Sequence, residues 1–397
     1  MALLSSEDAP SFTLRLSVLT LDTKEWEHAE VDPRVQRAFQ DLRLVVQRAP
    51  LAWADGAAAV YFVGQSQGLN DVWRIGVEPQ SRRVVSGPTR VTTSGDSTSA
   101  PTVSRDGQAM VFGVSRSETR IWSLGLTASG TAVGGPAEAL TATTTIASNL
   151  HLSADGSKLV YIVEQPGGSQ RREVRERRMV DGRERTLMRV DEANGEIRGP
   201  LRWSPDGRVL AYRYVPPGSG VEQSTGVSRV FALQSLRLRN VDTEKDSQLT
   251  SPQQVLDFPN DWSRDGKFVL TSGNRYSTDG HATLAMVPIA RAPHAESGAR
   301  VMVEAADPAA RLYQPGLSPD GRWLCFVQST ESGSQVKVAP VDGGRWTHVA
   351  AGAAVDDKPR WSVNGRLLYF TSRRGGLNNV WGIRFDPASG NTIGDAF

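Results

Sequence analysis

The 397-residue sequence has few of the residues from which catalytic and metal centres are built. Its one cysteine, Cys325, lies in the apolar run 323–326, so an internal disulfide is excluded and the thiol is expected to be a buried apolar group. No Cys-x-x-Cys pair, calcium-loop spacing or phosphate-binding glycine loop occurs. The five histidines show no paired spacing (His28, His151, His281, His294 and His348). We therefore predict no metal site and no cofactor.

The sequence also lacks an excess of charge and a long apolar run. Its net charge of +2 provides no general attraction for nucleic acid or anionic membranes. Residues 171–190 hold eight arginines but no aromatic residue, which is more typical of an exposed strand than of a nucleic-acid surface. No segment approaches the roughly 18 apolar residues of a membrane span, so no membrane insertion is expected.

The N-terminal residues lack the basic and apolar regions of a signal peptide. We therefore expect a cytoplasmic location for the chain as written. A periplasmic location is expected instead if the chain is a fragment of a longer exported or membrane-anchored protein.

The sequence does contain a repeated turn. In Ser204-Pro205-Asp206-Gly207, proline presets the backbone, aspartate can bond back to it, and glycine accepts a positive φ. Apolar segments rich in aromatic and β-branched residues flank this turn, as expected for two strands of a hairpin. Related turns recur at intervals of 44 to 59 residues and are centred on Gly56, Gly107, Gly156, Gly207, Gly266, Gly321 and Gly365.

Each repeat has room for two further strands after its hairpin, such as residues 71–77 and 89–93 in the first repeat. Four strands in about 50 residues is typical of a propeller blade. We therefore predict an all-β, seven-bladed β-propeller of four-stranded antiparallel blades over residues 33–397. Residues 1–32 are predicted to be an N-terminal lead, in which the strand Leu14–Leu21 closes the ring by completing the last blade.

The repeat Trp-Ser-x-Asp-Gly, followed by alternating apolar residues, resembles the propeller repeats of the TolB family and of prolyl oligopeptidases. The best matches are residues 203–207 and 317–321, and the resemblance covers about residues 50–397. The last repeat is similar to propellers appended to bacterial kinases and winged-helix regulators. Because the matching residues build turns and core, the resemblance implies a fold and says little about function.

The candidate binding site is the loop face of this propeller. Polar loops that enter the inner strands, together with the connections between the second and third strands, are expected to gather on one face. The candidate residues are Asp96, Ser99, Asn149, His151, Asn260, Asp261, Tyr313, Gln314, Asp356, Asp357, Lys358, Arg373, Arg374 and Asn378.

Two enzymatic alternatives remain open. Loop acids from three repeats (Asp96, Asp261, Asp356 and Asp357) could converge at the channel mouth, as in a glycosidase or lyase. The chain could also be the propeller half of a peptidase like prolyl oligopeptidase. The stretch 64–68 fits the Gly-x-Ser-x-Gly nucleophile pattern, but a strand is expected to follow it, where a true nucleophile elbow leads into a helix.

The sequence therefore favours a non-catalytic binding module. We predict a monomeric propeller, within a larger sensor or regulatory polypeptide, that docks a protein or peptide on its loop face.

Overall fold

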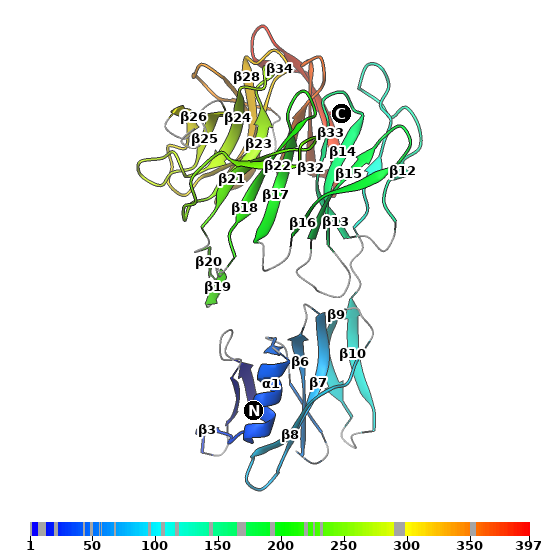
Figure 1. Ribbon diagram of the computed structural model, residues 1–397, viewed down its shortest axis with the longest axis vertical. Coiled ribbons are helices and arrows are strands. Elements are labelled where there is room, and N and C mark those ends of the chain that lie inside the picture. The colour runs from blue at the N-terminus through cyan, green and yellow to red at the C-terminus, as the bar shows by residue number, and fades with distance from the viewer. Residues whose placement is uncertain are drawn as a thin grey trace. The chain divides into compact units, whose positions relative to one another are not determined.

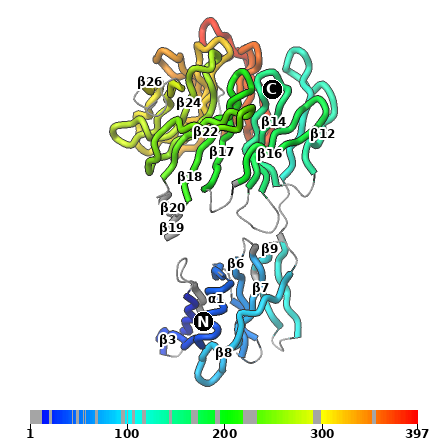
Figure 2. The backbone as a smooth tube through the Cα atoms, in the orientation of Figure 1, coloured from blue at the N-terminus to red at the C-terminus, as the bar shows by residue number. Residues whose placement is uncertain are grey.

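The computed structural model resolves two units along the chain, Met1–Glu118 with Gln165–Gln170 (unit 1) and Thr119–Glu164 with Arg171–Phe397 (unit 2). Figures 1 and 2 show the strands of both units. The structure describes residues 2–6, 13–19, 23–42, 44–47, 51–54, 56, 58–66, 69–93, 97–104, 108–115, 119–142, 146–164, 172–190, 195–217, 221–224, 227–230, 233–289, 298–349 and 355–397.

Unit 1 contains the N-terminal strands, helix α1 (Pro33–Asp41) and the first repeat. One antiparallel sheet comprises β1 (Ala2–Ser6), β2 (Leu14–Leu19) and β3 (Trp26–His28). A second comprises β4 (Val45–Val46), β5 (Ala52–Ala54), β6 (Ala59–Ser66), β7 (Leu69–Val77) and β8 (Val84–Arg90). The strands β9 (Ser97–Val103) and β10 (Met110–Ser115) form a separate hairpin.

Helix α1 (Pro33–Asp41) forms where the sequence pattern alone predicts no single structure. Asp32 caps it by accepting a hydrogen bond from the Arg34 amide at 2.8 Å. Val35 and Phe39 lie one turn apart, and both are buried. Phe39 stacks on Phe62 of β6 with ring centroids 6.0 Å apart, so the helix packs on the first repeat.

Unit 2 contains five four-stranded antiparallel sheets, which we name blades 3 to 7 after their repeats. Blade 3 has β13 (Ile146–Leu152), β14 (Lys158–Glu164), β15 (Arg172–Arg178) and β16 (Glu184–Val190); blade 4 has β17 (Glu196–Trp203), β18 (Val209–Val215), β21 (Ser235–Asn240) and β22 (Lys245–Gln248). Blade 5 has β23 (Asp257–Trp262), β24 (Phe268–Gly273), β25 (Thr283–Pro288) and β26 (Arg300–Glu304). Blade 6 has β27 (Arg311–Leu317), β28 (Trp323–Thr330), β29 (Gly333–Pro340) and β30 (Thr347–His348); blade 7 has β31 (Asp356–Trp361), β32 (Leu367–Gly375), β33 (Leu377–Asp386) and β34 (Asn391–Ile393).

Two short hairpins complete unit 2. They are β11 (Trp122–Ser123) with β12 (Glu138–Ala139), and β19 (Val221–Ser224) with β20 (Val227–Val230), which is inserted in blade 4. Ile121, next to β11, packs with Leu159 and Tyr161 of blade 3. In the segment between β11 and β12, the Gly130 carbonyl accepts a hydrogen bond from the Tyr369 hydroxyl of blade 7 at 2.8 Å. The 119–140 segment therefore joins blade 3 to blade 7.

The repeated turn folds as its sequence predicts. In blade 4 the Ser204 hydroxyl donates to Asp206 Oδ1 at 2.6 Å, and the Arg208 amide donates to the same oxygen at 3.1 Å. The corresponding serine–aspartate bonds form in blades 3, 5 and 6. The turn glycine has a positive φ at each described copy, namely Gly56, Gly156, Gly207, Gly266, Gly321 and Gly365. The aspartates are thus turn formers.

Consecutive blades share hydrophobic cores. Leu270 and Leu284 of blade 5 pack with Leu324 and Phe326 of blade 6. On the other face of β28, Cys325 packs with Leu368 of blade 7 and is fully buried. Burial raises the pKa of the Cys325 thiol to about 12, as expected for an inert apolar group.

The all-β class and the four-stranded antiparallel blade are confirmed. The second repeat differs from the expected blade, because its strands form two separate hairpins, β9–β10 in unit 1 and β11–β12 in unit 2. Its last two strands are only two residues each, and the stretch that joins them is rich in glycine, serine and threonine, which favour turns.

The predicted ring closure is not among the strand pairings of the described residues. The strand β2, which lies within the expected closing strand, pairs instead with β1 and β3. Blade 7 obtains its fourth strand, β34, from the C-terminal residues of the chain. Leu14 and Leu16 of β2 are buried against Phe39 and Phe62, so the apolar face of this strand is used within unit 1.

Candidate functional site

The predicted site residues that the structure describes lie on strands rather than in loops. Ser99 is exposed on β9 of unit 1. The others lie in unit 2, Asn149 and His151 on β13, Asn260 and Asp261 on β23, Tyr313 and Gln314 on β27, Asp356, Asp357 and Lys358 on β31, Arg373 and Arg374 on β32, and Asn378 on β33. Asp96 lies outside the described residues. The loop assignment is therefore wrong for the described members.

A bulge in the inner strand of each of blades 3 to 7 explains why polar residues are found there. The pairing of the first two strands shifts register at the same place in blades 3 to 7. Asn149, Gln314 and Lys358 adopt positive φ at these bulges. The Lys358 amide donates to Gln314 Oε1 at 2.8 Å, so this glutamine links blade 6 to blade 7.

Asn260 also has a structural role. It is 5% exposed, and its Nδ2 donates to the Phe258 carbonyl at 2.7 Å and to Ser272 Oγ at 2.8 Å. A buried amide with these bonds fixes the path of β23 and is not available to a ligand.

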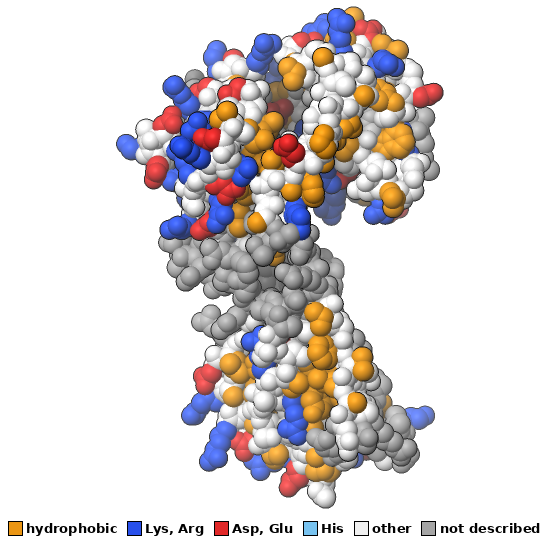
Figure 3. Space-filling view, turned by 90° about the vertical axis from the view of Figure 1, so that its right-hand side faces the viewer, with side chains coloured by type: hydrophobic (Ala, Val, Ile, Leu, Met, Phe, Trp, Pro, Cys, Tyr) orange, Lys and Arg blue, Asp and Glu red, His pale blue; other side chains and the backbone are white. Residues whose placement is uncertain are grey.

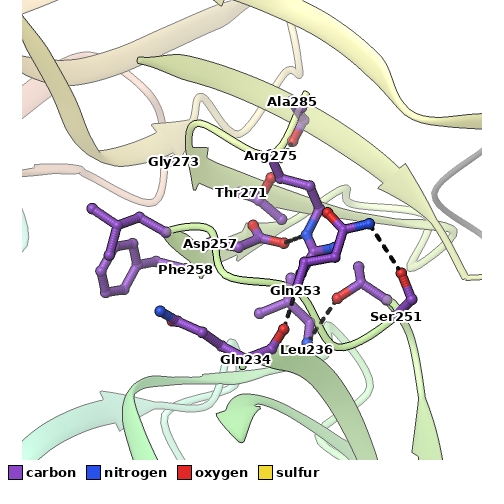
Figure 4. Close-up of polar contacts among 12 residues, drawn as sticks. Gln234, Leu236, Ser251, Gln253, Asp257, Phe258, Thr271, Gly273, Arg275 and Ala285 are labelled. Carbon is purple, nitrogen blue, oxygen red and sulfur yellow. Dashed lines mark hydrogen bonds and ion pairs between the residues drawn. The ribbon is translucent and has the colours of Figure 1, made fainter. Parts of the chain in front are cut away.

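Two further predicted residues form a buried ion pair at the start of the inner strand. Arg374 Nη2 donates to both carboxylate oxygens of Asp356 at 2.9 Å. Blade 5 repeats this arrangement, because Arg275 Nε donates to Asp257 Oδ2 at 2.7 Å (Figure 4). Burial raises the pKa of Asp257 to about 6, whereas Arg275 and the Thr271 hydroxyl oppose that rise.

These two ion pairs lie at the end of the blade where the inner strand begins. We call this end of each blade the connection end. The connection between the second and third strands lies there as well, because Asp356 pairs with Ser372 and Asp257 with Gly273. The repeated serine–aspartate turns lie at the other end, the turn end.

At the connection end of blade 7, the β32–β33 hairpin exposes apolar side chains. Leu377 is 76% exposed and Val380 is 72% exposed. Arg373 and Asn378, both exposed, belong to the same hairpin. We call these four residues the hairpin patch.

Nearer the turn end, four charged or titratable side chains from four blades converge. They are His151, Arg202, Asp261 and Arg360. Asp261 accepts hydrogen bonds from the Trp262 and Leu317 amides, both at 2.8 Å. Burial raises the pKa of Asp261, and these two bonds oppose the rise. We call this group the axial cluster.

The axial cluster includes two arginines that sequence reasoning missed. Arg202 and Arg360 each lie two residues before the turn serine, the position that His151 and Asp261 occupy in their own blades. Aligning the copies on this serine, rather than on polarity, would have found them.

The Gly-x-Ser-x-Gly serine is not a nucleophile elbow. Ser66 ends β6, which pairs with β7 as an antiparallel hairpin, and its hydroxyl donates to the Leu42 carbonyl at 2.8 Å. It lines a mostly apolar surface pocket of about 420 Å³ with Trp73 and Arg90. The strand that follows Ser66 confirms the structural interpretation of this motif.

The part of the chain that the structure describes contains no group of three or more His, Cys, Asp or Glu side chains able to hold a metal ion. The helix α1 has nine residues, and no described helix is long and apolar enough to span a membrane. On the face of unit 2 shown in Figure 3, basic and acidic side chains are interspersed.

The repeated four-stranded blades and their shared turn define an all-β protein of the β-propeller type. No protein-family model matches the chain. It is 25% identical over 194 residues to an uncharacterized protein of Agrobacterium fabrum. That alignment covers 41% of this chain and 66% of the relative, so the chain spans just under two thirds of the relative's length.

The solved structures that are similar to this chain include TolB proteins and several enzymes. TolB from Acinetobacter baumannii is 11% identical with a TM-score of 0.49, over 100% of this chain and 80% of that one. An oligogalacturonate lyase from Vibrio parahaemolyticus is 10% identical with a TM-score of 0.46, over 99% and 84%. An acylaminoacyl peptidase from Pyrococcus horikoshii is 9% identical with a TM-score of 0.42, over 88% and 45%.

Proposed function

We propose that this chain is a non-catalytic binding module that docks a protein or peptide at the connection end of its blades, within a larger sensor or regulatory polypeptide. The observation that carries the proposal is the hairpin patch. Leu377 and Val380 expose most of their apolar surface to solvent on the same hairpin as the exposed Arg373 and Asn378. Apolar residues rimmed by polar ones are typical of protein contact sites.

The described acids favour this function over a glycosidase or lyase. Acid/base chemistry of that type needs two carboxylates that face the substrate. Here Asp356 is paired with Arg374, Asp357 lies 2.7 Å from Lys358 Nζ, and Asp261 is held by two backbone amides. Asp356 and Asp261 therefore have structural partners on all their carboxylate oxygens, whereas Asp357 is paired through Oδ2 and its buried Oδ1 accepts no hydrogen bond within the described residues. The peptidase alternative requires an α/β-hydrolase domain elsewhere in a longer polypeptide.

The test is a selection of random displayed peptides on the immobilised chain. The variant Leu377→Ser/Val380→Ser removes the apolar part of the patch without disturbing a core. Val363→Ser is the matched control, because Val363 is 95% exposed at the turn end of the same blade. We expect enriched peptides to bind the double variant at least tenfold more weakly and the control unchanged.

Two outcomes would contradict the proposal. One is that no peptide is enriched on the wild-type chain, and the other is that the double variant retains every enriched peptide. Cleavage of a uronate-containing oligosaccharide by the wild-type chain would favour the lyase alternative.

A further inference from the structure

The axial cluster occupies one equivalent position in five consecutive blades. This position lies two residues before the turn serine of each blade. Its residues are His151 on β13, Arg202 on β17, Asp261 on β23, Gly316 on β27 and Arg360 on β31. Each inner strand contacts the next, and each has its bulge just before this position. The five positions therefore follow one another along the inner side of the blades.

Hydrogen bonds between neighbouring blades fix these residues. Arg202 Nη1 donates to the Leu201 carbonyl at 2.8 Å, and Arg202 Nε donates to the Asn260 carbonyl of blade 5. The Trp262 indole donates a hydrogen bond to the Arg202 carbonyl at 3.1 Å, so the main chain of Arg202 is also fixed by blade 5. The guanidinium of Arg202 is thus held rigidly, and the residue is only 5% exposed.

The hydrogen bonding of His151 defines its protonation. Its Nδ1 accepts a hydrogen bond from the Trp203 amide at 3.1 Å, so the ring is neutral and Nε2 carries the proton. Burial, and next the charges of Arg202 and Arg360, lower the pKa of His151 to about 3. The ring therefore offers one N–H donor and no charge at neutral pH.

The cluster carries an excess of positive charge. Two guanidinium groups face one carboxylate, and Asp261 is already engaged by the Trp262 and Leu317 amides. Within the ranges that the structure describes, no carboxylate lies within the 4.0 Å of an ion pair from Arg202 or Arg360. Burial, and next the charge of Arg360, lower the pKa of Arg202 to about 9, whereas the charge of Asp261 opposes that fall. A bound anion would add to the compensation that Asp261 provides.

Arg360 is the solvent-exposed member of the cluster. Its Nη1 donates to the Pro359 carbonyl at 2.7 Å. Gly316 carries no side chain, and a Cβ atom added to it would lie 3.3 Å from Cys325 Sγ, 3.8 Å from Asp261 Oδ2 and 3.9 Å from Trp361 Cδ1. The close approach of Cys325 thus explains the glycine, and the other four positions supply the polar groups of the cluster.

We propose that the axial cluster is a carboxylate-binding site, in which Arg360 and Arg202 bind the carboxylate and His151 Nε2 donates a hydrogen bond to it. The planar guanidinium fork matches a carboxylate and is a fixed donor set, unlike the mobile ammonium of a lysine. The carboxylate belongs either to a small organic acid or to an acidic side chain of a peptide. This site is distinct from the hairpin patch and does not depend on the proposed function.

The test measures binding to the full chain by isothermal titration calorimetry at pH 7.5 and low ionic strength. The probes are succinate, a capped pentapeptide with a central glutamate, the same peptide with glutamine, and sulfate. The variants are Arg360→Gln, Arg360→Lys and Arg311→Gln. Arg311 is an exposed arginine at the connection end of β27, so its variant makes the same charge change outside the cluster.

We expect succinate or the glutamate peptide to bind the wild-type chain, and which of the two binds identifies the source of the carboxylate. Arg360→Gln should weaken that binding at least tenfold, Arg360→Lys by less, and Arg311→Gln by under twofold. The hairpin-patch variant Leu377→Ser/Val380→Ser should leave succinate binding unchanged, which separates this site from peptide docking.

The proposal is overturned if neither carboxylate binds the wild-type chain, if sulfate binds as tightly as succinate, or if Arg311→Gln weakens binding as much as Arg360→Gln does. Because Arg360 is exposed, the Gln variant retains the fold, and an unchanged melting temperature verifies this.

Discussion

At the scale of the residue, the turn aspartate has a measurable structural role. Asp206→Ala removes the bonds from Ser204 Oγ and the Arg208 amide, and we expect it to lower the free energy of unfolding by about 1 kcal/mol. Asp206→Asn is the matched control, because Asn364 of blade 7 accepts the same two bonds, from Ser362 Oγ at 2.9 Å and the Arg366 amide at 3.0 Å. Urea unfolding at pH 7 measures both variants.

The same residue gives a pH dependence with a defined sign. The Ser204 hydroxyl, and next the Arg208 amide, lower the pKa of Asp206 in the folded chain. Its contribution is therefore present above the unfolded pKa of about 3.9 and is lost as the pH falls through the folded pKa. The difference between wild type and Asp206→Ala should shrink in acid. A deficit in Asp206→Asn as large as that in Asp206→Ala would contradict this account.

At the scale of the element, the repeated ion pair holds the connection end of a blade. Asp257 and Arg275 are both nearly fully buried, and Arg275 Nη2 also donates to the Gln234 carbonyl at 3.1 Å. Arg275→Met leaves a buried carboxylate without its cation, so we expect a loss of about 3–5 kcal/mol in the free energy of unfolding. Lys267→Ala in the same blade removes an exposed pair with Asp265 and should cost under about 1 kcal/mol.

The urea unfolding midpoints of Arg275→Met and Lys267→Ala measure the difference in stability between the two variants. Adding Asp257→Asn to Arg275→Met removes the unpaired charge, so the double variant should be more stable than Arg275→Met alone. Equal losses of unfolding free energy in Arg275→Met and Lys267→Ala would show that the buried ion pair contributes no more to stability than the exposed one.

The elements show what the sequence can and cannot predict. The hairpins were predictable because serine, aspartate and glycine act locally within four residues. The polar inner strands were not, because Asn149 and Lys358 sit in bulges whose geometry depends on the neighbouring blade. The Asp356–Arg374 pair was assigned to a ligand surface, although Asp257 and Arg275 stand at the same offsets from their own turn. Repeat alignment, and not polarity, reveals this internal pairing.

The position of the N-terminal strand was unpredictable for another reason. An apolar strand such as Leu14–Leu19 specifies that it must be covered, but it does not specify which sheet edge covers it. In the structure Leu16 is buried with Phe39 of α1, an element whose mixed periodicity hid it from sequence analysis.

At the scale of the whole molecule, the buried thiol of Cys325 can report on unit 2 alone. It is the one cysteine of the sequence, it is fully buried in blade 6, and a thiol of such high pKa reacts only after the structure opens. Leu16→Ala in unit 1 and Leu210→Ala in unit 2 remove the same atoms from fully buried sites, and each is expected to cost about 2–5 kcal/mol.

We expect Leu210→Ala to increase the labelling rate of Cys325 by a thiol reagent at least tenfold, because each 1.4 kcal/mol lost raises the open population about tenfold. Leu16→Ala should leave that rate unchanged, since Leu16 packs within the core of unit 1. If both variants increase the rate equally, the two units unfold as one, and the N-terminal strand supports the blades as its sequence first suggested. Labelling at several urea concentrations distinguishes the two results, because local opening is insensitive to urea and global unfolding is not.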